Sequence, residues 1–383
     1  MIILDVSELI ANPIRAGIQR VVRELIRRWP AEVPMRVARY DPTEGLVAVP
    51  DSAVELVTDC VPELAESPTS EVALRVASEL RRGGPTLPDN GRVLVPEVFY
   101  EDRRCAYYQA RLRADPASVA FIVYDFIPWL HPDRIGVEQS AHLMPYLRLL
   151  RTARRLAFIS GATRADYAQR VMRGRGVNGI VLPLGCDSLG LARQAFSASR
   201  CGFLCIGSID GRKNQDLVLR AFQMLWARGH EIPLTVVGDA FPRVDVTEFE
   251  ATRSHRLFAW HRHAGDAIVG DLLRTARGTI YASEIEGYGI PPMESLYAGV
   301  PVICAEALPS VAELPSAGHV RLAKITPETI ADAVVMLSND DIAARLWREA
   351  QHLTLATWVD FARQTASWMQ SAVSPTDPPA ATN

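Results

Sequence analysis

The most informative stretch of this chain is Ser283-Glu-Ile-Glu286-Gly-Tyr-Gly289-Ile-Pro-Pro-Met-Glu294, which predicts a turn followed by a helix. A short apolar run, Thr279 to Ala282, precedes it and predicts a strand. Pro291 predicts the start of a helix, because proline suits the first helical turn. Glu286 and Glu294, eight positions apart, are therefore expected in a turn and on the first turns of the helix that follows.

The helix start in this stretch is expected to attract phosphate. Backbone N–H groups at Gly289 and its neighbours lack helical partners, and the helix dipole favours an anion at that end. Two carboxylates nearby would repel a bare phosphate but suit a ligand that also carries hydroxyl groups, such as a ribose or a hexose. A sugar nucleotide combines these groups. The alternative is an acidic surface loop, but the glycines, prolines and glutamates are many special residues for a plain connector.

A second informative stretch is Phe203-Leu-Cys-Ile-Gly207-Ser-Ile-Asp-Gly-Arg212-Lys213-Asn, which predicts a strand followed by a turn. The residues after it have the spacing of a helix. A guanidinium beside a compact ammonium, Arg212 and Lys213, would suit a diphosphate. The alternative is that both are solvated loop charges.

The two stretches resemble signatures of the family 4 retaining glycosyltransferases. Glu286 to Glu294 is similar to that family's E-x7-E motif, and Gly207 to Asn214 is similar to its Gly-x-x-x-x-Arg-Lys-Asn turn. The resemblance covers residues 200–370 and, more loosely, 1–200. It implies an α/β chain with the GT-B fold, in which two Rossmann-like doubly wound domains face each other across a cleft.

The resemblance also implies a role for each signature residue. Glu294 would contact the ribose hydroxyls and Glu286 the transferred sugar, while Arg212 and Lys213 would hold the diphosphate and stabilise the charge that grows on it. The pair of basic residues makes a metal unnecessary, and we expect no other cofactor. The remaining donor-binding residues are expected to be Gly287, Tyr288, Gly289, Ile290, Gly207, Ser208 and Gly17.

Two segments in the N-terminal half resemble the family's acceptor side. Gly17 precedes a predicted helix and is similar to the family's glycine segment near the phosphates and the acceptor; the alternative is a plain helix start. Val123-Tyr-Asp-Phe-Ile-Pro resembles a segment that often reads His-Asp, so Asp125 is predicted to be catalytic and to contact the acceptor. Tyr124, also assigned to the acceptor, stands where many relatives have histidine. The alternative for Asp125 is a loop residue that caps a turn.

Apolar runs alternate with segments of helical spacing through most of the chain, which predicts parallel sheets in an α/β fold. Helices are expected, for example, at residues 163–172 and 291–297. Residues 41–90 mix prolines, glutamates and short apolar runs and indicate no topology.

The length of 383 residues predicts more than one domain. We expect a Rossmann-like acceptor domain at residues 1–185, a linker at 186–200 and a Rossmann-like nucleotide-sugar domain at 201–353. Residues 354–373 resemble the family's last helix, which crosses back to the N-terminal domain. Residues 374–383 are expected to be disordered.

Composition predicts a soluble, cytoplasmic protein. Charged residues make up 22%, the six cysteines are scattered, and the net charge of −3 argues against nucleic-acid binding. The first residues lack a signal-peptide pattern, and no apolar run is long enough to span a bilayer. The basic amphipathic segment from Tyr146 to Leu156 is either a solvated helix face or a peripheral contact with the inner face of the plasma membrane.

The sequence therefore predicts a retaining, metal-independent hexosyltransferase that uses a nucleoside-diphosphate sugar, with GDP-mannose as the leading donor. The acceptor would be a saccharide or lipid-linked saccharide in bacterial surface-polysaccharide synthesis, which includes lipopolysaccharide. One alternative is a sugar-nucleotide epimerase or hydrolase of the same fold, and another is an inactive glycan-binding partner subunit. A glycosidase would not need the basic pair, and the G-x-G-x-x-G fingerprint of an NAD enzyme is absent after the first strand. The spacing of His255, His261 and His263 matches no standard zinc site.

Overall fold

The computed structural model describes residues 1–11, 17–59, 78–79, 83–135, 137–175, 177, 179–241 and 244–372. Contacts divide the chain into two compact units. Unit 1 comprises Met1–Leu184 and Thr357–Asn383, and unit 2 comprises Gly185–Ala356. The predicted disordered tail, 374–383, lies outside the described residues.

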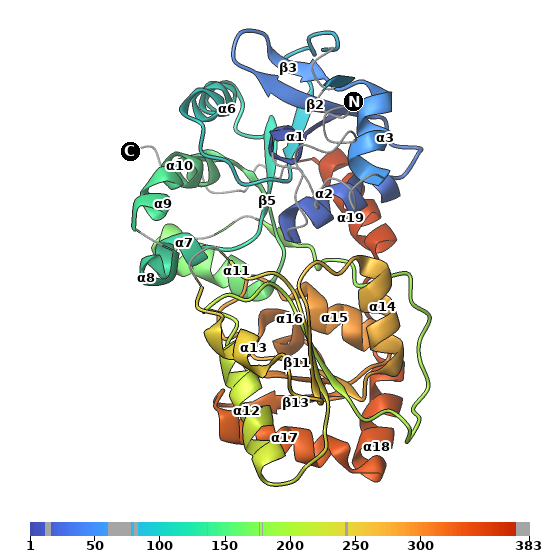
Figure 1. The fold of residues 1–383 in the computed structure, drawn as a ribbon. Coiled ribbons are helices and arrows are strands. Elements are labelled where there is room, and N and C mark those ends of the chain that lie inside the picture. Colours follow the sequence, from blue (N-terminus) through green and yellow to red (C-terminus); the bar gives the residue numbers. More distant parts are fainter. Residues whose placement is uncertain are drawn as a thin grey trace. The chain divides into compact units, whose positions relative to one another are not determined.

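Unit 1 is built on a seven-stranded sheet in the order β3-β2-β1-β4-β5-β6-β7 (Figure 1). Neighbouring strands are parallel except β2 and β3, which pair antiparallel. The strands are β1 (Ile2–Asp5), β2 (Met35–Asp41), β3 (Gly45–Ala48), β4 (Arg92–Val95), β5 (Val119–Val123), β6 (Arg155–Phe158) and β7 (Ile180–Val181). Every residue of β1, β5 and β6 is buried, as expected for parallel strands covered on both faces.

The helices of unit 1 include one from the far end of the chain. They are α1 (Ser7–Ala11), α2 (Gly17–Arg28), α3 (Asp51–Asp59), α6 (Asp102–Ala114), α7 (Ile127–Leu130), α8 (Pro132–Ile135), α9 (Val137–His142), α10 (Met144–Thr152), α11 (Gly161–Asp166), a π-helical turn (Tyr167–Val171) and α19 (Trp358–Gln370). α19 packs against α2, at the edge of unit 1 in Figure 1. Arg92 Nη1 donates to Met369 O at 2.7 Å and Arg155 Nη2 to Trp368 O at 3.0 Å. Two guanidinium groups thus bind carbonyl oxygens at the carboxyl end of α19, where the helix dipole favours cations.

Unit 2 has a parallel six-stranded sheet in the order β10-β9-β8-β11-β12-β13. Its strands are β8 (Phe203–Ile206), β9 (Leu234–Val237), β10 (Phe258–His261), β11 (Gly278–Tyr281), β12 (Val302–Ala305) and β13 (His319–Leu322). Its helices are α12 (Gln215–Ala227), α13 (Thr247–Thr252), α14 (Asp266–Thr275), α15 (Ile290–Tyr297), α16 (Pro309–Ala312), α17 (Pro327–Ser338) and α18 (Asp340–His352). The strand order reverses between β8 and β11, and ligands of such sheets bind where the order reverses, at the carboxyl ends of the strands.

The predicted α/β class with two Rossmann-like sheets is confirmed. Several boundaries differ from expectation. Residues 186–200, expected to be a linker, group with unit 2, because Leu191 is buried in its core and Gln194 N donates to Ala298 O at 2.8 Å. α15 begins at Ile290 rather than at residue 291. The helix expected at 163–172 is divided into α11 and the π-helical turn.

Candidate active site

The turn after β8, Gly207–Asn214, is shaped by close contact between two backbones. Gly207 has a φ of 135°, and Gly238, directly after β9, has a φ of 144°. A Cβ atom on Gly238 would lie 2.1 Å from the carbonyl oxygen of Gly207. Only residues without a side chain allow this approach, so the β8 turn is fixed against the end of β9.

Lys213 lies over the beginning of its own turn. Its Nζ donates a hydrogen bond to Ser208 Oγ at 3.1 Å, and it is 3.3 Å from the position that a Cβ on Gly207 would occupy. The three predicted donor residues Gly207, Ser208 and Lys213 are therefore in contact. Since a hydroxyl group is the partner shown for Nζ, the ammonium charge is not cancelled by that contact.

Arg212 is held by Asp210, a residue that the sequence analysis did not single out. Arg212 Nη2 donates to Asp210 Oδ2 at 2.6 Å and Nε to the same oxygen at 3.0 Å; the two side chains are 19% and 14% exposed. Burial acts to raise the pKa of Asp210, but the hydrogen bonds and charge of Arg212, with Lys213, lower it overall. The turn thus combines two cations with one carboxylate, whereas the sequence analysis considered the cations alone.

Two contacts join the β8 turn to the turn after β11, Ala282–Gly289. Asn214, with a left-handed φ of 54°, donates from Nδ2 to Ala282 O at 3.0 Å and to Glu284 Oε2 at 3.1 Å. Ser283 Oγ lies 3.4 Å from the carbonyl oxygen of Arg212. The two sequence stretches, about seventy residues apart along the chain, thus form one site within unit 2.

Glu286 is anchored through one carboxylate oxygen. Tyr281 OH donates to Glu286 Oε1 at 2.8 Å, and Ser283 Oγ donates to the same atom at 3.0 Å. Burial, followed by the charge of Glu286, raises the pKa of Tyr281 well above its usual value, so the phenol stays a donor. Because both bonds fall on Oε1, Oε2 keeps its capacity to accept hydrogen bonds from a ligand.

Glu294 lies on α15 and is 4% exposed. Ser188 Oγ donates to its Oε1, although the two residues are 106 positions apart. Burial raises the pKa of the nearby Cys186 thiol, and Glu294 raises it further, so this cysteine stays protonated. Ser188 and Cys186 belong to the segment at the start of unit 2, and no local sequence pattern marks either of them.

The start of α15 offers fewer phosphate donors than a helix start usually does. Gly289 caps it with a φ of 97°, a conformation that glycine adopts readily. Pro291 and Pro292 are the second and third helical residues and have no N–H. Of the backbone N–H groups expected to bind phosphate at this helix start, those of Gly289 and Ile290 are therefore the ones present.

The other two β11-turn residues predicted to bind the donor are buried. Gly287 and Tyr288 both have low exposure, and Tyr288 is 6% exposed. Its carbonyl oxygen accepts a hydrogen bond from Ser310 N at 3.1 Å, and Ser310 Oγ donates to Gly289 O at 3.2 Å. Ser310, on α16, thus fixes the backbone from which α15 begins.

The predicted acceptor residues Tyr124 and Asp125, and the predicted donor residue Gly17, lie in unit 1. Gly17 is the first residue of α2 and is exposed. Asp125 Oδ1 accepts a hydrogen bond from Ile127 N at 3.0 Å, which is the turn-capping contact given above as the alternative to a site role. Tyr124 is 5% exposed, its OH donates to Pro96 O at 2.7 Å, and burial raises its pKa far above the usual value. The Tyr124 hydroxyl is therefore engaged inside unit 1.

Several other sequence features also have definite places. His263 Nδ1 is 3.0 Å from Asp239 Oδ2, and His255 stacks on Trp226. The described residues contain no group of three or more potential metal ligands.

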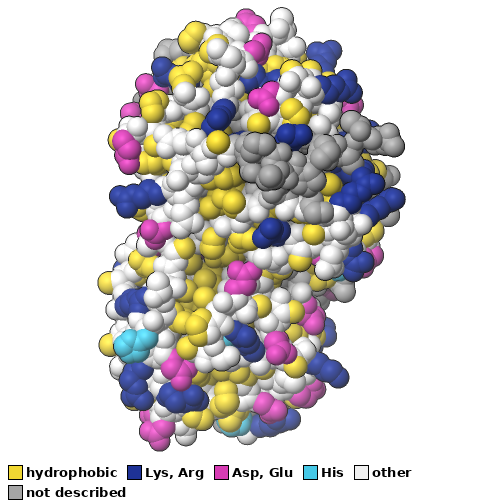
Figure 2. All heavy atoms as spheres, turned by 180° about the vertical axis from the view of Figure 1, so that it is seen from behind, with side chains coloured by type: hydrophobic (Ala, Val, Ile, Leu, Met, Phe, Trp, Pro, Cys, Tyr) yellow, Lys and Arg dark blue, Asp and Glu magenta, His cyan; other side chains and the backbone are white. Residues whose placement is uncertain are grey.

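In α10, Tyr146, Leu149 and Leu150 are buried, so this helix packs its apolar face into the core. Figure 2 shows acidic and basic side chains interspersed on one face of the molecule. Among the described residues, no helix combines the length and apolar composition that crossing a bilayer requires.

Comparison with known proteins identifies the C-terminal part of the chain. Residues 196–352 match the family model described as glycosyl transferases group 1. The Escherichia coli serotype-specific mannosyltransferase WbdA is 25% identical over 248 residues, which are 58% of this chain and 30% of WbdA. The Escherichia coli O-antigen chain mannosyltransferase B is 29% identical over 251 residues, 61% of this chain and 60% of the relative. The chain thus spans less than two thirds of these relatives, and less than a third of WbdA.

A solved structure extends the likeness to both units. Anabaena HepE, determined in complex with UDP and glucose, superposes with a TM-score of 0.62 at 12% identity. The match covers 96% of this chain and 98% of HepE. At this identity the likeness concerns the fold.

Proposed function

We propose that this chain, in which residues 196–352 match the model of group 1 glycosyltransferases and both units have the GT-B fold, transfers a hexose from a nucleoside-diphosphate sugar to a saccharide or lipid-linked saccharide, with retention of anomeric configuration. The mannosyltransferase names of two relatives favour GDP-mannose as donor and bacterial surface-polysaccharide assembly as the process. The observation that carries the proposal is the junction of the two turns in unit 2, where Asn214 and Ser283 connect the backbone beside Arg212 and Lys213 to that beside Glu286.

In this proposal the β8 turn receives the diphosphate. Lys213 and Arg212 supply positive charge, and the pairing of Arg212 with Asp210 leaves the turn with one net positive charge. Fixed cations stabilise the leaving diphosphate more as its bond to the sugar breaks, so they lower the barrier as well as aiding binding. The N–H groups of Gly289 and Ile290 are available for the same phosphates.

The β11 turn and α15 receive the sugars. Glu286 Oε2 would accept a hydrogen bond from a hydroxyl of the transferred hexose, because Oε1 already holds Tyr281 and Ser283. Glu294, buried on α15 with Ser188, would accept from the ribose hydroxyls. A carboxylate that hydrogen-bonds sugar hydroxyls supplies orientation.

The transfer step needs no protein nucleophile. The bond between the anomeric carbon and the phosphate oxygen breaks, and the acceptor oxygen forms its bond to that carbon on the same face. The departing phosphate takes the proton of the acceptor hydroxyl. We assign acceptor recognition to unit 1, with Asp125 and the Gly17 segment, and propose no metal in the step.

A binding assay followed by product analysis tests the proposal. GDP-mannose and GDP should raise the melting temperature, whereas UDP-glucose and dTDP-rhamnose should raise it less, because a ligand that binds the native state stabilises it. Incubation with GDP-mannose and a mannan oligosaccharide should yield an α-linked product by NMR. A β-linked product would contradict retention. Rapid consumption of the donor without acceptor would favour an epimerase or hydrolase, and absence of nucleotide-sugar binding would favour an inactive partner subunit.

Contact with a membrane is a separate part of the proposal, because a lipid-linked acceptor resides there. The exposed Arg148 and Arg151 on α10 supply positive charge, while Tyr146, Leu149 and Leu150 of that helix are buried in the core. Any attraction to an anionic surface would therefore be mainly electrostatic and sensitive to salt. Co-sedimentation with phosphatidylglycerol vesicles at low salt should show it, and an R148Q/R151Q variant should not bind.

A further inference from the structure

A cluster of buried charged side chains lies at the carboxyl ends of β1 and β4 in unit 1, and the proposed reaction gives it no role. Arg104, from α6, donates from Nη2 and Nε to Asp5 Oδ2 at 2.7 and 3.1 Å. The same Nη2 is 3.4 Å from Glu97 Oε2. Arg104 and Asp5 are 0% exposed and Glu97 is 1% exposed, so solvent does not screen these charges.

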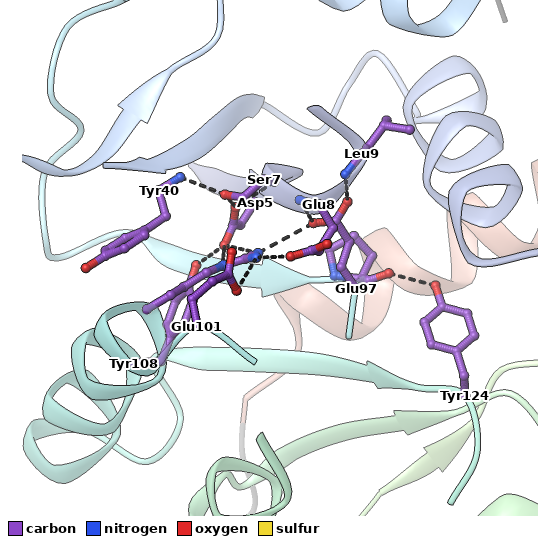
Figure 3. Close-up of polar contacts among 11 residues, drawn as sticks. Asp5, Ser7, Glu8, Leu9, Tyr40, Glu97, Glu101, Tyr108 and Tyr124 are labelled. Carbon is purple, nitrogen blue, oxygen red and sulfur yellow. Dashed lines mark hydrogen bonds and ion pairs between the residues drawn. The ribbon is translucent and has the colours of Figure 1, made fainter. Parts of the chain in front are cut away.

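Both carboxylates of this cluster hold the backbone that follows β1 (Figure 3). Glu97 accepts hydrogen bonds from Glu8 N at 2.8 Å and from Leu9 N at 2.7 Å. Asp5 Oδ1 accepts from Ser7 N at 3.1 Å and from Ser7 Oγ at 2.5 Å. The first residues of α1, Ser7 to Leu9, are therefore fixed by side chains from the ends of two strands.

The same cluster adjoins the segment that carries Asp125. Tyr124, directly after β5, donates its hydroxyl to the carbonyl oxygen of Pro96, the residue before Glu97 (Figure 3). The carbonyl oxygen of Tyr124 accepts from Thr163 Oγ1 at 2.9 Å. Since β1, β4 and β5 are parallel neighbours, their carboxyl ends lie at one edge of the sheet. The contacts of Glu97 and Tyr124 thus connect three segments at that edge.

Stability alone is a weak reason for this cluster. Burying ions costs several kcal/mol each, and replacing a buried ion network by apolar residues is often neutral or stabilising. Two carboxylates share one guanidinium here, with Glu8 3.6 Å and Glu101 3.9 Å from Arg104 Nη1, and Tyr108 donates to Asp5. Burial therefore raises the pKa of Glu97 to about 8 despite Arg104. The carboxyl groups of Asp5 and Glu97 do, however, accept hydrogen bonds from the backbone N–H groups of residues 7 to 9.

We propose that Asp5, Glu97 and Arg104 are positioning residues for glycosyl transfer, which fix the segments after β1, β4 and β5 so that Asp125 and the Gly17 segment meet the acceptor in one geometry. This inference rests on the proposed function and deepens its acceptor side. None of the three residues is expected to touch a substrate, because all are buried. Their effect is expected on acceptor use, while donor binding in unit 2 is unchanged.

The first test compares Glu97→Gln with Glu101→Gln. Both remove one carboxylate near Arg104, but only Glu97 accepts from the backbone, and the amide of Gln cannot accept both bonds. With GDP-mannose and a mannan oligosaccharide, E97Q should lower kcat/KM for the acceptor about tenfold and leave the dissociation constant for GDP unchanged. The wild type should show a transition in acceptor kcat/KM near pH 8 that E97Q lacks. Amide hydrogen exchange at residues 8 and 9 should rise in E97Q only.

The second test removes hydroxyl groups and leaves every charged side chain in place. It therefore tests the inference even if E97Q fails to fold. Ser7→Ala removes the hydroxyl that joins Asp5 to Tyr40 N, and Ser118→Ala removes a hydroxyl before β5, at the other end of the same sheet. S7A should lower acceptor kcat/KM severalfold, and S118A should not. The inference would be overturned if acceptor kcat/KM were the same in E97Q and E101Q and the same in S7A and S118A. It would also be overturned if E97Q or S7A lost donor binding to the same extent as acceptor use. A wild-type protein that transfers sugar from no donor would instead overturn the proposed function.

Discussion

Each sheet has an arginine held by an aspartate beside its first strand, but the two pairs differ in exposure. In unit 1, Asp5 and Arg104 are both 0% exposed. In unit 2, Asp210 and Arg212 are 14% and 19% exposed, and Lys213 adds a second cation. In the sealed pair Arg104 binds carboxylates and Asp5 also accepts from Ser7 N, whereas the partly open turn keeps a net positive charge that a solvent-borne anion can reach.

The difference shows how one type of ion pair serves two purposes. In the sealed site Asp5 matches the charge of Arg104, and burial raises the pKa of the second carboxyl group, Glu97, to about 8, so that this group is mostly neutral below that pH. In a partly open site an excess cation is tolerated because water solvates it until a phosphate takes the place of water. Loss of Arg104 should therefore cost more stability than loss of Arg212, whereas loss of a cation from the β8 turn should act mainly on turnover.

The largest effect is expected from Arg104→Met, which leaves Asp5 and Glu97 buried without a cation. Breaking a buried charge network by removing one partner costs about 3–5 kcal/mol of unfolding free energy. Arg212→Met, at the partly open pair, should cost about 1 kcal/mol. Urea unfolding of both variants measures the two losses of unfolding free energy. Equal losses would show that the Asp5–Arg104 and Asp210–Arg212 pairs do not differ in their contribution to stability.

The next effect is expected on turnover. Lys213→Ala should lower kcat about 10²–10³-fold, the loss typical of removing one group that stabilises transition-state charge. Its unfolding free energy should change little. The matched control is Lys324→Ala, which removes the chain's other lysine, an exposed one in unit 2. If K213A and K324A have the same kcat, the diphosphate is not held by the β8 turn.

A smaller loss is expected from Asp210→Asn. The amide no longer fixes the guanidinium of Arg212 through charged hydrogen bonds, so we expect kcat to fall about tenfold, about 1.4 kcal/mol in activation free energy. Nucleotide affinity should be equal or higher, because the turn gains a net positive charge. Steady-state kinetics measures the change in kcat, and titration with GDP measures the change in nucleotide affinity. Weaker GDP binding in D210N would contradict the assignment.

The smallest effect is a difference in pH dependence. The pKa of Glu97 in the folded chain, about 8, lies above its ordinary value, so the stability it contributes is fully present below about pH 4.5 and is lost as the pH rises through 8. Between pH 7 and pH 8 the wild type should lose about 1 kcal/mol more unfolding free energy than E97Q. Parallel urea-unfolding curves for the two proteins over this range would show that Glu97 does not titrate there.

The sequence predicted those parts of the fold whose signals are local and apolar. The apolar runs at residues 92–95 and 234–237 predict two strands, which are β4 and β9, and α15 begins within one residue of expectation. α6 was missed because its buried residues, Arg104, Cys105, Tyr108 and Leu112, have helical spacing but include an arginine and a tyrosine. β13 was missed because it is an edge strand with alternating polar residues. Neither pattern stands out by hydrophobicity.

For the candidate site, the two turns were recognisable but their supporting contacts were not. The adjacency of the turns follows from their place after β8 and β11, where the strand order reverses. Asp210 stands two residues before Arg212, so this pair had a sequence signal that a search for carboxylate partners would find. Ser188 reaches Glu294 across 106 residues, and no local pattern predicts such a contact.

The return of α19 to unit 1 also fixes an order of events during protein synthesis. The ribosome makes β1 to β7 first, then the whole of unit 2, and only afterwards the residues from 357 onward. Until then α2 lacks the helix it packs against, and Arg92 and Arg155 lack the carbonyl groups they bind. The sheet that is translated earliest therefore belongs to the unit whose last helix is made after the whole of unit 2.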